Sequence, residues 1–390
     1  MNAQIVGRLA VVGMVGLLAG GCSTVEEWIS PVEIDPPAEL QNIENPVGVE
    51  VVWSRDTGGG DEQDLRLVPA YREGRLYTAN AAGEVSALDA ASGRVEWSVD
   101  LDLAASGGPG VGEGLVLLGT SDAEVVALAI ESGEQRWLAR VSSEVLAAPV
   151  AAFGRVVVRT IDGKVIGLDA GTGEQRWQYE REIPILTLRG TSTPVISGTA
   201  VLVGMAGGKL VALDITTGAL LWEATITVPS GRSELERLAD IDGDPLVADG
   251  LIYVATYQGE VAALGENSGA VLWRRKFSSY SRMAADSYKV YASDADGVMW
   301  ALNADNGAAR WSQEGLRNRQ LSDVAVLNDV IAVGDFEGYV HFLSTDDGLL
   351  IGRTRVGSKP VRDGMLVAGE TLYVQGDAGD LKAIRLRDTR

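Results

Sequence analysis

The sequence predicts an all-β fold in which eight four-stranded antiparallel blades form a closed β-propeller. Three observations lead to this prediction. A motif of fifteen residues, seen as GKLVALDITTGALLW at 208–222, recurs along most of the chain. The 48 glycines among 390 residues follow no collagen triplet, so they indicate many tight turns between short elements. A strand-like segment near the N-terminus also stands outside the repeats and could close the ring.

The repeat occurs eight times, and fixed periods of this size are typical of repeat architectures rather than of several unlike domains. The copies open at Gly83, Ala123, Gly163, Gly208, Gly259, Gly297, Gly338 and Gly379. Within a copy, GKLVALD alternates as a half-buried strand does, ITTG has turn chemistry, and ALLWEATI reads as a second strand. Two more short strands precede each copy, which gives four strands per roughly 40 residues, the size of a propeller blade.

A tryptophan follows a turn glycine by four residues in six of the copies. The pairs are Gly93/Trp97, Gly133/Trp137, Gly173/Trp177, Gly218/Trp222, Gly269/Trp273 and Gly307/Trp311. A large flat ring can fill the wedge between neighbouring blades, and glycine permits the positive φ that a tight hairpin needs. We therefore interpret the tryptophans as packing residues and not as a ring of ligand-stacking aromatics.

The array ends irregularly. The seventh copy has Gly352 where the tryptophan is expected, and the eighth stops after GDLKAIRL. The segment VEVVWSRD at 49–56 has a strand pattern and Trp53 but no preceding repeat. We expect it to pair beside the last strand and close a propeller that spans residues 49–390, because a closed ring leaves no exposed sheet edge.

The N-terminus has the features of a lipoprotein signal. Arg8 precedes an apolar run from Leu9 to Leu18, which is too short to span a bilayer, and small residues lead to Cys22. The ending LAGGC resembles a bacterial lipobox, in which the cysteine is acylated and becomes the first residue. We predict a signal peptide at 1–21 and a lipidated tether at 22–48.

The remaining chemistry of the chain excludes several classes of function. The net charge of −21 opposes binding along a nucleic-acid backbone. A single cysteine allows no internal disulfide, and a single histidine, His341, excludes a multi-histidine metal site. We expect this histidine to be packed or solvated, and we expect no cofactor, no metal and no small-molecule substrate.

Two local patterns suggest sites but do not satisfy the rules for them. DIDGDP at 240–245 spaces three aspartates as a calcium loop does, yet Pro245 and Leu251 stand where that loop needs glycine and glutamate. The glycine cluster GGPGVGEG at 107–114 has the wrong spacing for a phosphate loop. We interpret the glycine cluster as a turn between blades.

Function is expected where the repeat is interrupted. The spacing from Gly163 to Gly208 is 45 residues and that from Gly208 to Gly259 is 51, the two longest in the array. The extra residues fall at 179–194 and 224–245, between the last strand of one blade and the first of the next. Such connections emerge on one face of a propeller, so the two insertions are expected to lie side by side.

The pattern LD-x-x-x-G-x-x-x-W resembles the repeats of pyrroloquinoline-quinone (PQQ) type propellers over nearly the whole chain after the signal. Quinoprotein dehydrogenases of that class use an adjacent cysteine pair, a calcium-bound cofactor and a catalytic aspartate. This sequence has no second cysteine, so we predict that it is not an enzyme. A periplasmic quinoprotein dehydrogenase, or another ligand-binding propeller, remains the alternative.

A more specific resemblance comes from the lipobox, the eight blades and the two insertions together. The loops LTLRG and RSELERLADID are similar to those of the BamB family, lipoproteins of the outer-membrane β-barrel assembly machinery. The resemblance implies a scaffold at the outer membrane that faces the periplasm, binds the POTRA domains of BamA and supports insertion of outer-membrane proteins. By position it implies contact residues Leu186, Leu188, Arg189, Asp240 and Asp242.

Overall fold

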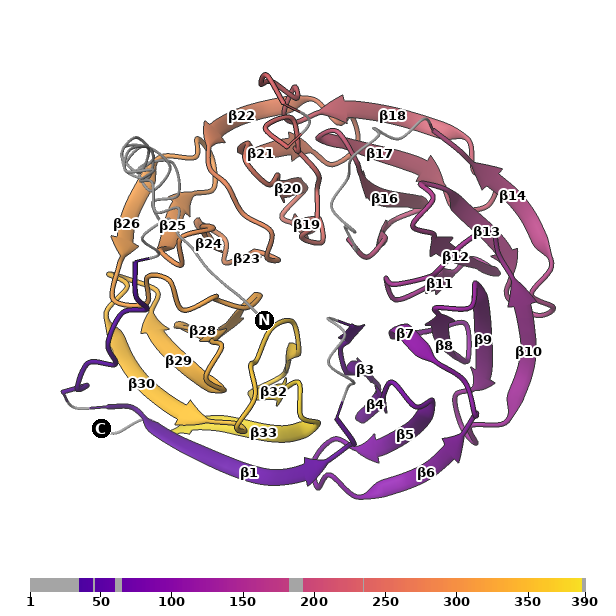
Figure 1. Cartoon of the computed structure of the whole chain (residues 1–390), viewed down its shortest axis with the longest axis horizontal. Coiled ribbons are helices and arrows are strands. Elements are labelled where there is room, and N and C mark those ends of the chain that lie inside the picture. Colours follow the sequence, from indigo (N-terminus) through magenta and orange to yellow (C-terminus); the bar gives the residue numbers. More distant parts are fainter. Residues whose placement is uncertain (1–34, 45, 60–64, 182–191, 234, 388–390) are drawn as a thin grey trace, which may run out of the picture. The chain divides into compact units, whose positions relative to one another are not determined.

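The computed structural model describes residues 35–44, 46–59, 65–181, 192–233 and 235–387. The chain divides into two compact units, 1–36 and 37–390, and every strand that the structure describes belongs to the second. The described residues form strands and turns without a helix, so none of them belongs to a helix able to cross a membrane. The second unit is a ring of eight blades with four antiparallel strands each, as the repeat predicts, and the sheet of the second blade has one additional short strand (Figure 1).

The first seven blades run from an inner strand to an outer strand in chain order, and the eighth takes its outer strand from the N-terminal segment. The first blade comprises β3 (Ala70–Arg72), β4 (Arg75–Ala79), β5 (Glu84–Asp89) and β6 (Val95–Asp100). The second comprises β7 (Ala105–Gly112), β8 (Leu115–Thr120), β9 (Glu124–Ala129) and β10 (Gln135–Arg140). The third comprises β11 (Val150–Ala152), β12 (Arg155–Arg159), β13 (Val165–Asp169) and β14 (Gln175–Tyr179). The fourth comprises β15 (Val195–Ser197), β16 (Ala200–Met205), β17 (Lys209–Asp214) and β18 (Leu220–Thr225).

The second half of the ring repeats this plan. The fifth blade comprises β19 (Leu246–Ala248), β20 (Leu251–Ala255), β21 (Glu260–Gly265) and β22 (Val271–Lys276). The sixth comprises β23 (Ala284–Ala285), β24 (Lys289–Ser293), β25 (Met299–Asn303) and β26 (Ala309–Gln313). The seventh comprises β27 (Val324–Leu327), β28 (Val330–Gly334), β29 (Tyr339–Ser344) and β30 (Leu350–Arg355). The eighth comprises β31 (Met365–Ala368), β32 (Thr371–Gln375), β33 (Asp380–Arg387) and β1 (Gly48–Asp56).

Closure by the N-terminal strand is confirmed. The outer strand of the eighth blade is β1, which pairs antiparallel with β33 from Gly48 opposite Arg387 to Asp56 opposite Asp380. The indole N–H of Trp53 donates to the carbonyl of Ala90 in the first blade, 3.0 Å away. The two ends of the chain therefore complete one blade, and that blade docks on the next as the others do.

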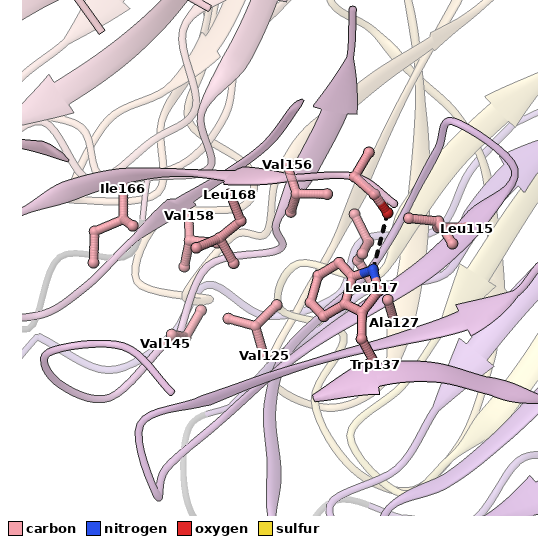
Figure 2. Close-up of a cluster of buried hydrophobic side chains, with 11 residues drawn as sticks. Leu115, Leu117, Val125, Ala127, Trp137, Val145, Val156, Val158, Ile166 and Leu168 are labelled. Carbon is pink, nitrogen blue, oxygen red and sulfur yellow. Dashed lines mark hydrogen bonds between the residues drawn. The ribbon is translucent and has the colours of Figure 1, made fainter. Parts of the chain in front are cut away.

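The tryptophans pack between blades, and the structure adds a reason for the turn glycines. In Figure 2 the indole of Trp137 lies among apolar side chains of the second and third blades, and its N–H donates to the carbonyl of Ala170. A Cβ atom added at Gly173, in the third-blade turn, would lie 2.7 Å from that indole. The same contact joins Trp53 to Gly93, Trp97 to Gly133, Trp177 to Gly218, Trp222 to Gly269, Trp273 to Gly307 and Trp311 to Gly348.

The irregular seventh copy is explained by the N-terminal segment. A Cβ atom added at Gly352, the position without a tryptophan, would lie 2.8 Å from the side chain of Val47. The amide of Val47 donates to the carbonyl of Ile351, 2.7 Å away. The chain thus enters the ring where the seventh tryptophan would stand, because the split eighth blade offers that tryptophan no turn glycine.

Part of the segment predicted as a tether also contacts the ring. The amide of Ala38 donates to the carbonyl of Arg317, and the buried guanidinium of Arg319 donates to the carbonyl of Ala38. Both arginines belong to the connection between β26 and β27. The boundary of the tether at residue 48 stays a prediction, but Ala38 and Val47 within it are bonded to the propeller.

The interpretation of residues 107–114 as a turn between blades is wrong. Residues 105–112 form β7, the inner strand of the second blade. A Cβ atom at Gly110 would lie 1.7 Å from the carbonyl oxygen of Pro149, and one at Gly112 would lie 2.3 Å from that of Ala151. The backbone of the third blade passes so close that glycine is needed inside a strand, a use that turn signals alone do not distinguish.

A pair of glycine substitutions tests the contact between blades. Gly173→Ala places a methyl group against Trp137, whereas Gly154, with a similar positive φ of 69°, has open space around it. We expect Gly154→Ala to cost about 1–2 kcal/mol for the left-handed backbone alone. Gly173→Ala should cost about 1–3 kcal/mol more, because it also overpacks the interface. Urea unfolding of both variants measures this difference, and equal losses would show that the indole contact is not needed.

Candidate functional site

The two insertions into the repeat lie between β14 and β15 and between β18 and β19. Leu186, Leu188 and Arg189 of the first insertion lie outside the described residues, so their role stays a prediction. The described ends of the two insertions do meet. The amide of Thr193 donates to Oδ1 of Asp244, 2.6 Å away, which joins the end of the first insertion to the end of the second.

Asp240 lies inside the protein at the base of the second insertion. Its side chain is buried, and Oδ1 accepts a hydrogen bond from the amide of Gly207 at 2.9 Å. Its carbonyl accepts the amide of Tyr257 at 3.0 Å. These bonds fix the insertion to turns of the fourth and fifth blades. Asp240 therefore has a structural role, because it fixes the conformation of the second insertion.

Asp242 is half-buried, and its Oδ1 is a buried oxygen with no hydrogen-bond partner. Burial and the neighbouring Asp240 raise the pKa of Asp242 to about 6, against the opposite effect of Arg159 and Arg66. The hydroxyl of Ser192, at the end of the first insertion, is also buried without a hydrogen-bond partner. Two unsatisfied polar atoms thus lie where the insertions meet, an arrangement that costs stability.

Two arginines of the chain face these aspartates. The guanidinium of Arg159 donates to the carbonyl of Ser192 at 3.3 Å. Burial lowers the pKa of Arg159, and Asp242, Asp240 and Asp244 partly oppose that shift. Asp240 and Asp242, which the resemblance implies as contacts for a partner, therefore already interact electrostatically with Arg159 of the protein itself.

Arg66 is the second of these cations, and sequence analysis did not single it out. It contacts Asp244 at 3.3 Å, Asp363 at 3.4 Å and Asp323 at 3.7 Å. Burial favours its neutral form, but Asp244, Asp363 and Asp323 together raise the pKa of Arg66 above its usual value. It lies in β2 (Arg66–Leu67), outside every repeat, so the periodicity of the sequence carried no signal for it.

The tip of the second insertion presents apolar side chains to solvent. Val228 is 70% exposed and Leu235 is 62% exposed. The tip has its own hydrogen bonds, since the carboxylate of Glu236 accepts the amide of Arg232 at 2.6 Å and Arg237 donates to the carbonyl of Gly231. A loop that exposes large apolar groups is typical of a contact surface for another protein.

The other candidate chemistry is internal. His341 is fully buried, with Nε2 2.8 Å from Oδ2 of Asp335, and burial lowers its pKa. Asp240 and Asp244 use carboxylate oxygens on backbone amides, and the described part of the chain contains no group of three or more His, Cys, Asp or Glu placed to hold a metal ion. A cavity of about 540 Å³ opens beside Arg66, with the half-exposed Asp363 and the buried Gln375 among its walls.

Comparison with known proteins agrees with this architecture. The family described as "Outer membrane protein assembly factor BamB" matches residues 45–105 and 81–313. A protein of that name from Pseudomonas aeruginosa is 50% identical over 353 residues, which covers 90% of this chain and 93% of the relative. The crystal structure of BamB from Moraxella catarrhalis superposes with a TM-score of 0.79 at 28% identity, over 87% of this chain and 100% of that one.

A more distant likeness concerns the fold alone. The quinohemoprotein alcohol dehydrogenase from Comamonas testosteroni superposes with a TM-score of 0.66 at 13% identity, over 87% of this chain and 76% of that one. At that identity the shared propeller says nothing about activity. The long match at 50% identity and the family match across most blades lead to one conclusion: the chain belongs to the BamB family.

Proposed function

We propose that this protein is a non-enzymatic scaffold in the assembly of outer-membrane proteins. Its membership of the BamB family supports a role in that assembly and a place at the outer membrane. The observation that carries the proposal further is the joined pair of insertions. They interrupt an otherwise regular ring, meet through Thr193 and Asp244, and combine an exposed apolar tip with an unsatisfied buried carboxylate.

In this proposal the two insertions bind the POTRA domains of BamA. Val228 and Leu235 supply exposed apolar area, and the LTLRG loop adds Leu186, Leu188 and Arg189. Asp240 fixes the base of the second insertion through its bond to the amide of Gly207, and Asp242 supplies a carboxylate for a polar group of the partner. Apolar anchors that surround a few polar groups are the usual composition of a strong protein interface.

The anchor is the second part of the proposal. Cys22 follows a signal-like segment and is the chain's single acylation candidate. Ser23 after the cysteine resembles the choice found in lipoproteins sent on to the outer membrane. We propose that acylated Cys22 holds the propeller on the periplasmic side of that membrane.

The alternative is a ligand-binding propeller, and the cavity beside Arg66 is the observation in its favour. A quinoprotein dehydrogenase is a poor fit, because its adjacent cysteine pair cannot be formed from one cysteine. Titration of the purified protein with PQQ and calcium separates the two proposals. A bound chromophore in stoichiometric amount would replace the scaffold by a cofactor-binding protein.

The anchor is tested by Cys22→Ala. We expect the variant to lose incorporation of a palmitate analogue during metabolic labelling and to leave the membrane fraction, because no other thiol can be acylated. The ring should still fold, since residue 22 precedes every strand. Label retained by the variant would contradict the proposed lipidation.

The partner surface is tested by Arg189→Ala. Loss of a bidentate donor at the centre of an interface should weaken binding to the purified POTRA region of BamA by about 2 kcal/mol or more. Arg353→Ala is the control, because Arg353 lies in β30 of the seventh blade, where its guanidinium stacks on Tyr339. Equal affinities for wild type and both variants would remove the insertion from the mechanism, and equal losses would indicate diffuse electrostatics.

Asp242 allows a test that depends on pH. Its folded-state pKa, about 6, is above the usual value of 3.8, so the folded protein holds this proton more tightly than the unfolded chain. The ionised carboxylate therefore lowers stability above pH 6, and this penalty disappears as the pH falls below about 4.

We expect Asp242→Asn to raise the free energy of unfolding at pH 7.5 by roughly 1–3 kcal/mol and to change it little at pH 4. The same variant should bind the POTRA region less tightly, which is the pattern of a residue kept for binding at a cost in stability. Urea unfolding at both pH values and one binding titration measure these effects. A variant destabilised equally at both pH values would show that Asp242 is a structural group.

A further inference from the structure

The segment that follows the closing strand β1 enters the middle of the ring. Its strand β2 pairs in parallel with β7, with Arg66 opposite Gly107 and Leu67 opposite Gly108. This makes the second blade a five-stranded sheet, the only one with a parallel pair among the described strands. A Cβ atom at Gly107 would lie 2.7 Å from the carbonyl oxygens of Val145 and Ala147, so the chain leading to the third blade packs closely on this inner strand. The segment is therefore fixed by backbone bonds, and these direct Arg66 toward blades on the other side of the ring.

The guanidinium of Arg66 joins three blades that are not neighbours of its own. Asp244 precedes the fifth blade, Asp323 precedes the seventh and Asp363 precedes the eighth. All three carboxylates lie within 3.7 Å of its nitrogens, and the Arg66 side chain is 12% exposed. A guanidinium can contact several carboxylates at once because its donors point in several directions, which an ammonium group cannot match. Arg66 thus links, through its salt bridges, three connections between blades that are far apart in the sequence.

The same guanidinium also holds the end of the second insertion. One nitrogen, Nη1, donates to the carbonyl of Asp242 at 3.4 Å and to Oδ1 of Asp244 at 3.3 Å. That Oδ1 accepts the amide of Thr193, the second residue after the undescribed part of the first insertion. A chain of contacts therefore runs from Arg66 through Asp244 to the ends of both insertions.

We infer that Arg66 is a positioning residue for the partner-binding surface, which couples closure of the ring to the geometry of the two insertions. The inference rests on the proposed function only for the identity of the partner. Without Arg66, the largely buried carboxylates of Asp242, Asp244 and Asp323 lose a shared cation and repel one another. The end of the second insertion then moves, although the insertion tip itself is unchanged.

The test uses the full-length protein with Arg66→Gln and Arg66→Lys. Arg282→Gln is the matched control, because Arg282 shares Asp323 at 3.7 Å and donates to the carbonyl of Met365, but the contacts of its side chain do not include Asp244. Asp244→Asn is a second probe that weakens the link to the insertions while Arg66 keeps Asp323 and Asp363. It serves if removal of the arginine prevents folding.

Two measurements are made on each variant. The first is trypsin cleavage after Arg232 and Arg237 in the insertion tip, followed by mass spectrometry without any partner. The second is titration with the purified POTRA region of BamA. We expect Arg66→Gln and Asp244→Asn to be cleaved several times faster and to bind roughly 5- to 100-fold more weakly. Arg66→Lys should be cleaved more slowly and bind more tightly than Arg66→Gln, and Arg282→Gln should behave as wild type. The double variant that combines Arg66→Gln with Asp244→Asn should be cleaved no faster and bind no more weakly than either single variant.

The outcomes separate this inference from the proposed function. Unchanged cleavage and binding in Arg66→Gln, while Arg189→Ala still loses binding, would overturn the inference and leave the proposed function intact. Equal effects of Arg66→Gln and Arg282→Gln would also overturn it, since they would indicate general loss of charge. Binding that no variant alters would reject the proposed partner surface, and faster cleavage in Arg66→Gln alone would still establish that Arg66 positions the insertion.

Discussion

The contact of one blade's indole with the next blade's turn glycine is the interaction on which the rest of the ring depends. Each indole fills the wedge between two sheets, and in six of the seven pairs its N–H also bonds a carbonyl of the following blade. The glycine is constrained twice, by a positive φ in its own turn and by the ring that lies on it. Because each of the first six blades supplies both a turn glycine and a tryptophan, the repeat specifies both the blade and the contact between blades.

The place where the chain enters the ring follows from the same contact. The eighth blade is split between the two ends of the chain, so it has no turn glycine for a seventh-blade tryptophan to meet. Gly352 stands there instead, and Val47 occupies the space as the N-terminal segment passes. The segment then supplies β1 and Trp53, which restores the regular contact with the first blade. The N-terminal segment thus both enters and closes the ring, and it contacts the propeller through Ala38 and Val47 before β1 begins.

The middle of the ring has a different chemistry from its apolar joints. Arg66 and Arg159 face a group of aspartates that belong to connections between blades, and burial together with the neighbouring Asp240 raises the pKa of Asp242 there. Regular repeats do not need such a cluster, since the joints already hold the blades together. Its position at the base of the two insertions connects the closure of the ring with the surface that we propose for a partner. Unsatisfied buried groups of this kind are common at functional sites, where binding completes them.

The sequence by itself determined the blades, their number and the packing role of the tryptophans, because each of these depends on residues close together in the chain and repeated many times. It identified the closing strand too, because the last copy lacks an outer strand and the segment at 49–56 has the pattern of one. It also located the insertions, as departures from a fixed period. It did not determine the strand β7 in GGPGVGEG, since glycine demanded by the backbone of another blade looks the same as glycine demanded by a turn. Nor did it place Asp240 inside the protein or nominate Arg66, whose partners lie some 180 to 300 residues away in sequence. Only the tertiary structure decided these, because a salt bridge across the centre of a ring leaves no periodic or local pattern in the chain.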